Sequence, residues 1–264
     1  MVDIDTTIVW TFKNRIANLV RSLDTAHKTC SPMVKFCLID GGTNRSGLEH
    51  LKQWLSTNMK QRLINICESP NGTSICEGWN LGMYLAPTRY VIFASSDVVF
   101  NRVGWEEEMC ARFKEGKEYI LLENHAVFGF DKRVIPKMGW FDENYKSGPH
   151  FDVDFMIRAS ENGVKLHISH NYGFYDHADS AEETKDRLTK DCPDRLPMND
   201  FHNEDYFKNK WRTDWPGWRE SIARGIYNPL PHPPTSIAQV SRLSSETNWH
   251  PGWTEKILRL YGSN

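Results

Sequence analysis

The chain has 264 residues, of which 39% are hydrophobic and 25% charged, and its formal net charge at pH 7 is −2. These values are typical of a soluble globular protein that holds one large α/β domain with an appendage, or two small domains. A nearly neutral chain gives no support for binding to nucleic acid or to an anionic membrane, although a local basic groove is compatible with it. Composition leaves the oligomeric state open.

The cysteines and the N-terminus bear on the cellular compartment. The six cysteines form no CxxC pair, and Cys37, Cys67 and Cys76 lie in apolar segments, so we expect reduced, structural thiols. Asp3 and Asp5, with no long apolar run behind them, distinguish the N-terminus from a signal peptide. No stretch reaches the roughly 20 apolar residues that a membrane helix needs. We therefore expect a soluble, cytoplasmic protein without a membrane span.

Strands and helices are predicted to alternate along the first hundred residues. Short runs of β-branched and aromatic residues indicate strands, and apolar residues spaced three and four apart indicate helices. The strands are predicted at 6–12, 34–39, 62–67 and 90–94, and helices begin at 16 and cover 48–55 and 76–85. This alternation predicts a mostly parallel sheet covered by helices on both faces.

The most informative stretch is the fourth of these strands. Residues 90–94 have the length and residue types of a strand buried on both faces, and Ser95, Ser96 and Asp97 follow it. A carboxylate at the end of a buried strand needs a cation or hydrogen-bond donors. A turn-capping role for Asp97 is the simpler alternative.

Polar breaks also follow the first and second predicted strands, at 13–15 and 40–43. Ligands of parallel sheets bind at the carboxyl ends of the strands. We therefore expect these two breaks and the one at 95–97 to meet in one crevice.

Beyond residue 100 the pattern becomes less regular. We expect helices at 106–114 and 152–161, strands at 119–123, 126–130 and 164–169, a turn at 139–143 and a polar stretch at 170–177. We assign residues 1–181 to the main domain and 182–264 to an irregular C-terminal arm rich in tryptophan and proline. The arm's aromatic faces suit packing against sugar rings or bases, but the simpler interpretation for most of its tryptophans is that they attach the arm to the domain.

Several segments, in this order, resemble the glycosyltransferases of the GT-A fold, especially the family-2-like group. Residues 80–82 and 90–97 resemble its helix, strand and DxD metal motif, and His177 with Ser180 resembles its late H…S element. The turn at 139–143, with 151–155 and 158–159, resembles its GGFDE…EDxDL..RA segment. Its N…F..KW pattern is similar to Asn203, Tyr206, Phe207, Lys210 and Trp211.

The resemblance implies a GT-A-like enzyme that transfers a sugar from a nucleoside-diphosphate sugar, with UDP-sugars favoured, to a hydroxyl of a carbohydrate-type acceptor. It implies Mn²⁺ or Mg²⁺ as cofactor, held by Asp97 and His177, because a hard cation prefers oxygen ligands and Mn²⁺ also accepts imidazole. It makes Asp152 the general base of an inverting reaction. Asp154, two residues on, is the runner-up base.

For the donor, the resemblance implies contacts from Thr11 and Asp40 to the nucleoside. Asp40 equally suits a turn before the following glycines. The remaining residues expected at the donor are Arg15, Asn80, Ser95 and Ser96; Arg15 equally suits a solvated helix start.

Two departures from the family pattern keep other functions open. Ser95 occupies the first acidic position of DxD, and Phe151 stands where the family has Glu. A catalytically inactive carbohydrate- or nucleotide-binding domain is therefore one rival. A sugar-nucleotide nucleotidyltransferase is the other, because residues 41–45 resemble a GGxGTR loop, although that loop should follow the first strand and here follows the second.

Overall fold

A computed structural model of the chain describes residues 5–60, 62–68, 73–122, 126–145, 150–169, 173–177, 197–211 and 250–261. Its first half contains β1 (Thr6–Phe12), α1 (Ile16–Thr29), β2 (Lys35–Asp40), α2 (Arg45–Asn58), β3 (Leu63–Glu68), α3 (Ile75–Leu85), β4 (Tyr90–Ala94) and β5 (Val98–Phe100). Its second half contains α4 (Trp105–Lys114), β6 (Tyr119–Leu122), β7 (Val127–Asp131), the 3₁₀ turn η1 (Lys132–Val134), α5 (Ile135–Met138), α6 (Phe151–Glu161), β8 (Leu166–Ser169), β9 (Tyr175–His177), α8 (Pro197–Trp211) and α11 (Pro251–Tyr261).

Seven of these strands form one sheet in the order β3-β2-β1-β4-β7-β6-β8. The pairs β1–β2, β1–β4, β2–β3 and β6–β8 are parallel, whereas β7 runs antiparallel to both of its neighbours. The predicted mostly parallel α/β sheet is thus confirmed. The strands β5 and β9 form a separate antiparallel pair.

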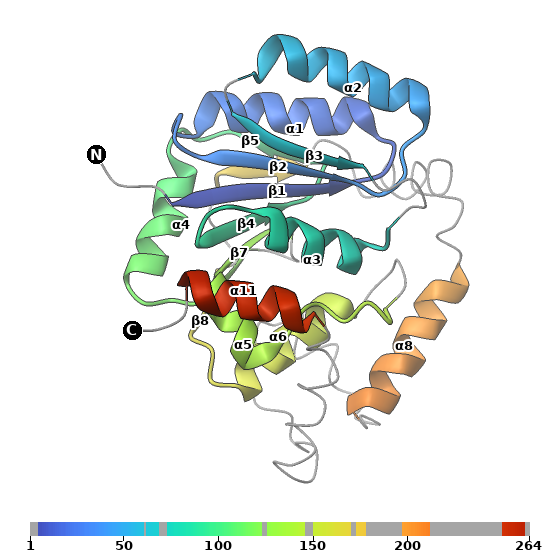
Figure 1. Ribbon diagram of the computed structural model, residues 1–264, viewed down its shortest axis with the longest axis vertical. Helices are drawn as coiled ribbons and strands as arrows, with labels where there is room; N and C mark the ends of the chain where they lie inside the picture. Colours follow the sequence, from blue (N-terminus) through green and yellow to red (C-terminus); the bar gives the residue numbers. More distant parts are fainter. Residues whose placement is uncertain are drawn as a thin grey trace.

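Helices cover both faces of this sheet (Figure 1). Alternate residues of β4 contribute to different cores: Val91 and Phe93 pack with residues of α3, α5, α6, α8 and α11, while Ile92 and Ala94 pack with residues of α1, α2 and α4. Side chains of a strand point alternately to opposite faces. The prediction that this strand is buried on both sides is therefore confirmed.

The helix α3 lies unusually close to the sheet. A Cβ atom at Gly82 would lie 2.4 Å from Val9 Cγ1 of β1, so only glycine permits this approach. A capping box starts the helix, in which Glu77 N–H donates to Ser74 Oγ (3.2 Å) and Ser74 N–H donates to Glu77 Oε2 (2.6 Å). Packing and capping together fix α3 beside the end of β1.

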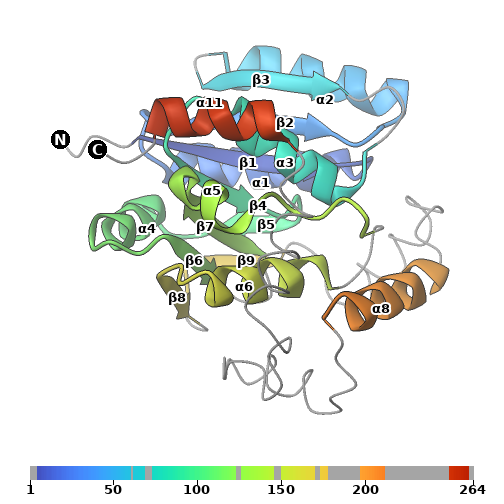
Figure 2. The same ribbon diagram turned by 60° about the horizontal axis from the view of Figure 1, so that its bottom comes forward.

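The C-terminal arm is more regular than the sequence predicts. The expectation of an irregular arm is wrong for α8 and α11, which are helices that add Phe207, Trp211 and Ile257 to the core. Both views place α11 beside α5 (Figure 2). On α11, the ring of Trp253 stacks on Tyr84 with centroids 4.2 Å apart. The rest of the arm, including Cys192, lies outside the described residues.

The other expectations about single elements have mixed outcomes. The stretch predicted as polar at 170–177 contains β9, and the sequence analysis did not foresee η1 and α5. Five cysteines are free thiols in the described part of the chain, as expected: Cys30, Cys37, Cys67, Cys76 and Cys110. Among the described helices, none has both the length and the apolar character required to cross a lipid bilayer.

A lysine lies buried beneath α11. Lys132 is 2% exposed; its Nζ donates to the carbonyl of Ala86 and lies 5.3 Å from the ring centroid of Tyr261. Burial, together with the nearby charge of Lys256, lowers the pKa of Lys132 from 10.5 to about 7. Near neutral pH the fold therefore holds this amine close to its point of deprotonation.

We expect Lys132 to make stability depend on pH. The folded chain loses this proton near pH 7 and the unfolded chain only near 10.5, so the unfolded chain binds more protons between those values. The free energy of unfolding of the wild type, minus that of Lys132→Met, should therefore rise by roughly 1.4 kcal/mol per pH unit in this window. Urea denaturation between pH 6 and 10 measures this difference in the free energy of unfolding. Lys114→Met, at an exposed position, is the control. A constant difference would contradict the expectation.

Candidate active site

The turns after β1, β2 and β4 lie together at the carboxyl edge of the sheet. Gly41 N–H donates to the carbonyl of Phe12 (2.7 Å), and Asn14 N–H donates to Thr43 Oγ1 (2.9 Å). Arg15 Nη1 lies 3.7 Å from Asp97 Oδ2. These contacts join all three polar breaks, so the predicted convergence is present in the structure.

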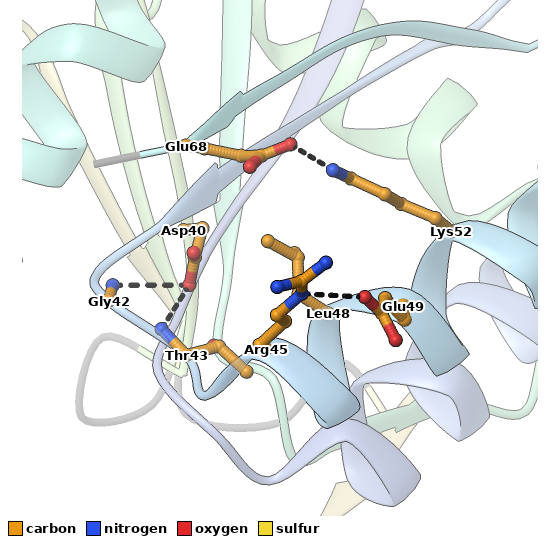
Figure 3. A pocket seen from close by; sticks show the side chains of 8 residues that line it. All are labelled: Asp40, Gly42, Thr43, Arg45, Leu48, Glu49, Lys52 and Glu68. Atoms are coloured by element: carbon orange, nitrogen blue, oxygen red, sulfur yellow. Dashed lines mark hydrogen bonds and ion pairs between the residues drawn. The ribbon is translucent and has the colours of Figure 1, made fainter. Parts of the chain in front are cut away.

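Asp40 lines a cavity at this edge. The cavity has a volume of about 670 Å³ and is also lined by Gly42, Thr43, Arg45, Leu48, Glu49, Lys52 and Glu68 (Figure 3). Its volume is in the usual range for small-molecule sites. Asp40 is 2% exposed, and its Oδ1 accepts hydrogen bonds from Thr43 N (2.8 Å) and Gly42 N (3.2 Å). Asp40 therefore forms the turn that the sequence offered as an alternative, and it also lines a cavity.

The charged groups around this cavity are arranged in pairs. Lys52 pairs with Glu68 across from Asp40, and Arg45 Nε donates to Glu49 Oε1 at 2.9 Å (Figure 3). Arg45 and Lys52, the two cations that line the cavity, are thus each paired with a carboxylate. The cavity offers a ligand both hydrogen-bond acceptors and donors without a strong net charge.

Thr11 lies in β1 with its side chain against α3, and it is not among the residues that line the cavity. Its Oγ1 is buried and has no hydrogen-bond partner among the described residues. A Cβ atom at position 78 would lie 2.4 Å from Thr11 Cγ2, so Gly78 is required for this packing. A buried hydroxyl without a partner is costly and leaves a hydrogen bond for another group to make.

Asn80 is not brought to the cavity. Its side chain is fully buried; Nδ2 donates to the carbonyl of Phe141 and to Glu143 Oε1 (both 2.8 Å), and Oδ1 accepts from Phe141 N (2.9 Å). The expectation that Asn80 contacts the donor is therefore not supported by its position. Asn80 instead fixes the turn around residue 141 against α3.

Asp97 lies in the turn between β4 and β5, with Ser95 and Ser96 before it. Ser95 N–H donates to the carbonyl of Ala126 (2.9 Å), which fixes the start of the turn. The β5–β9 pairing sets His177 opposite Val98, so the backbone of His177 lies beside the residue that follows Asp97. The side chain of His177 lies outside the described residues. Within those residues, no three His, Cys, Asp or Glu side chains form a cluster that could hold a metal ion.

The backbone around Arg15 is strained. Asn14 and Arg15 both have left-handed conformations, with φ of 55° and 46°. Such values are uncommon for residues other than glycine and are concentrated at functional sites. The strain sets the start of α1 so that the guanidinium of Arg15 lies beside Asp97, and the two side chains are 9% and 13% exposed.

Asp152 lies in the first turn of α6 and is partly buried, with Val153 N–H donating to its Oδ1 (2.8 Å). The strand β8 follows α6 and runs parallel to β6, so α6 returns across the sheet and begins near the carboxyl edge. A carboxylate is favoured at a helix N-terminus by the helix dipole. The topology thus brings Asp152 to the same edge as Asp40 and Asp97.

Asp154 cannot serve as the base from its present position, because it is fully buried. Its carboxylate accepts hydrogen bonds from Trp211 Nε1 and Arg158 Nε, both at 2.9 Å, and lies 2.8 Å from Lys210 Nζ. Burial alone would raise the pKa of Asp154, but Lys210 and Arg158 outweigh burial and hold it below its ordinary value. Asp154 is thus part of the protein's interior.

Two comparisons concern the chain's relatives in sequence. The family model described as Glycosyl transferase family 2 matches residues 7–172. The chain belongs to this family. It is a glycosyltransferase, as the sequence motifs predict. The family match argues against the nucleotidyltransferase alternative. A comparison with curated proteins found no match.

Solved glycosyltransferases share the fold at 11–12% sequence identity. The mannosyltransferase PcManGT from Pyrobaculum calidifontis, in complex with GDP-Man and Mn²⁺, matches with a TM-score of 0.58 over 98% of this chain and 85% of its own. GalNAc-T7 with UDP, GalNAc and Mn²⁺ matches at 0.56 over 97% of this chain and 58% of its own. S. aureus TarS matches at 0.54 over 69% of this chain, which spans only 38% of TarS. This similarity shows the GT-A fold.

We expect a methyl group at position 78 to disturb the site through Thr11. Gly78→Ala places a Cβ 2.4 Å from Thr11 Cγ2 and should lower the free energy of unfolding by about 1–3 kcal/mol, as overpacking does. Adding Thr11→Ser removes that Cγ2 and should recover part of the loss. Urea denaturation checks both variants against Gly252→Ala, where nothing lies within 4 Å of the new Cβ. Equal losses with and without Thr11→Ser would contradict this contact.

Proposed function

We propose that this glycosyltransferase moves a sugar from a nucleoside-diphosphate sugar, with UDP-sugars favoured, to a hydroxyl of a carbohydrate-type acceptor, with inversion at the anomeric carbon. One observation carries the proposal. The cavity beside Asp40, the turn that holds Asp97 and the start of α6 with Asp152 lie at the same edge of the sheet. Ligands of such sheets bind at this edge, so the nucleoside, the diphosphate and the acceptor would all lie along it.

The nucleoside would bind in the cavity beside Asp40. A carboxylate there can accept a hydrogen bond from a ring N–H of the base, and the hydroxyl of Thr11, on the α3 side of β1, makes no hydrogen bond within the described residues. TarS was solved in complex with UDP-GlcNAc and GalNAc-T7 with UDP, whereas PcManGT was solved with GDP-Man. UDP is therefore the first candidate, and GDP is the second.

Asp97 and His177 would hold Mn²⁺ or Mg²⁺. A carboxylate oxygen and an imidazole suit Mn²⁺, and two protein ligands leave positions for phosphate oxygens, which is how such cations are usually held beside nucleotides. A bound divalent cation would neutralise the charge that develops on the leaving diphosphate. Arg15, beside Asp97, adds positive charge at the same place. The hydroxyls of Ser95 and Ser96 would bind the ribose or a water in this turn.

Asp152 would act as the general base. Its carboxylate takes the proton of the acceptor hydroxyl while the acceptor oxygen bonds to the anomeric carbon, and the bond from that carbon to the diphosphate oxygen breaks on the opposite face. Phe151, where the family has Glu, packs edge-on against Trp79 with ring centroids 5.0 Å apart. This departure anchors the first residue of α6 to the core and leaves Asp152 without a second carboxylate next to it in the sequence.

A thermal-shift panel tests the donor and the metal. We expect UDP or a UDP-sugar, with Mn²⁺ or Mg²⁺, to raise the unfolding midpoint more than GDP, CMP or dTDP and their sugars, because binding to the native state alone stabilises it by mass action. EDTA or Asp97→Ala should remove the metal-dependent part of the shift. Asp205→Asn, at an exposed position on α8, is the control. Absence of a shift with every nucleotide would contradict the donor site.

Replacing the base tests catalysis. We expect Asp152→Asn to lower the rate of nucleoside diphosphate release from the donor by about 10²- to 10⁴-fold, because the amide cannot accept the acceptor's proton. The nucleotide-induced thermal shift should stay at its wild-type value. Transfer at the wild-type rate would sink the assignment of Asp152. Binding without release by the wild type would instead favour a nucleotide-binding domain.

A further inference from the structure

A lysine from the C-terminal arm joins two buried carboxylates beside the start of α6. Lys210 Nζ lies 2.6 Å from Asp142 Oδ2 and 2.8 Å from Asp154 Oδ1. The side chains of Lys210, Asp142 and Asp154 are 3%, 2% and 0% exposed. This ion cluster therefore lies in the protein's interior, where charges interact strongly and are screened little by salt.

The carboxylates of the cluster also accept hydrogen bonds from groups other than Lys210. Asp142 Oδ2 accepts from Tyr206 Oη (2.8 Å), and its Oδ1 accepts from Asn144 N (3.0 Å). Trp211 follows Lys210 in the chain, and its Nε1 donates to Asp154 Oδ1 (2.9 Å). The two carboxylates thus accept hydrogen bonds both from α8 and from the segments in which they lie, the turn of Asp142 and α6.

The cluster is balanced in charge only when α8 is in place. Asp142 and Asp154 contribute two negative charges, and the fully buried Arg158 contributes one positive charge through its bond to Asp154. Lys210 contributes the second. Removing one partner of a buried ion pair is strongly destabilising, because it leaves a buried charge without compensation.

Lys210 joins the helix that carries the proposed base to a turn outside that helix. Asp154 lies two residues after Asp152 at the start of α6, and Asp142 lies in the turn whose next residue, Glu143, accepts from Asn80 of α3 (2.8 Å). Lys210 thus connects the start of α6 with a turn that is fixed to the sheet through α3. Asp154 and Trp211 are 57 positions apart in the chain, so this link depends on the tertiary structure.

We propose that Lys210 is a positioning residue for glycosyl transfer: by bridging Asp142 and Asp154 it fixes the first turn of α6, and so the carboxylate of Asp152, against the sheet. This inference rests on the proposed role of Asp152. Lys210 itself is too buried to touch a substrate. The arm is then part of the catalytic unit.

Two variants and a matched control test this inference. Lys210→Met removes the bridge. Lys210→Met with Asp142→Asn removes one charge of each sign, so the cluster is again neutral and the variant should recover thermal stability. Lys208→Met is the control, because Lys208 lies on the same helix, is 45% exposed and, within the described residues, pairs with Glu204 one turn away.

The rates separate positioning from charge balance. With UDP-glucose and UDP-GlcNAc as probes and Mn²⁺ present, we expect kcat for nucleotide release to fall about 100-fold in both Lys210 variants, since a small misplacement of a catalytic group has such an effect. KM for the donor should stay unchanged, as should kcat of Lys208→Met. If the double variant recovers kcat together with its unfolding midpoint, Lys210 only balances charge and the inference is overturned.

Hydrogen exchange measures the position of α6 without relying on activity. We expect amides of residues 151–158 to exchange at least tenfold faster in the double variant than in the wild type, while β1 and β4 are unchanged, because local opening is read out element by element. Unchanged exchange at 151–158 would overturn the inference. If the wild type releases no nucleotide, the proposed function fails, and the exchange result alone decides whether Lys210 fixes α6.

Discussion

The parallel pairing of β1, β2 and β4 is the constraint on which the rest of the molecule depends. Parallel neighbours end at the same edge, and each return crossing is made by a helix on one face of the sheet. Both faces of these strands are buried, and their charged side chains lie at the strand ends or in the turns beyond them. Asp40, at the end of β2, and the pair of Arg15 with Asp97 therefore lie at the same edge of the sheet.

A second constraint acts on the other half of the sheet, where buried charges hold the arm. The antiparallel β7 reverses the chain, and the turn that follows α5 carries Asp142 into the interior. There it meets Asp154 and the two residues that end α8, Lys210 and Trp211. Because these groups are fully desolvated, their arrangement depends on all of them being present. The main domain and the arm thus share one core.

The two departures from the family pattern have different physical consequences. With Ser95 at the first acidic position, the turn after β4 has one carboxylate, Asp97, and a guanidinium beside it. In the proposed function, the guanidinium of Arg15 would supply part of the positive charge that a diphosphate requires. Phe151 exchanges a charge for an aromatic contact with Trp79. Each change alters the contacts around the site, and the site remains at the carboxyl edge of the sheet.

The sequence by itself determined the alternation of strands and helices, the burial of β4 on both faces and the turns that hold Asp40, Asp97 and Asp152, because periodicity and turn chemistry are local. It did not determine the part played by Asn80, which resembles a family motif but is saturated by Phe141 and Glu143. Nor did it show that Asp154 is buried or that Lys210 reaches it. Those contacts join residues far apart in the chain, so only the tertiary structure, through packing and desolvation, decided them.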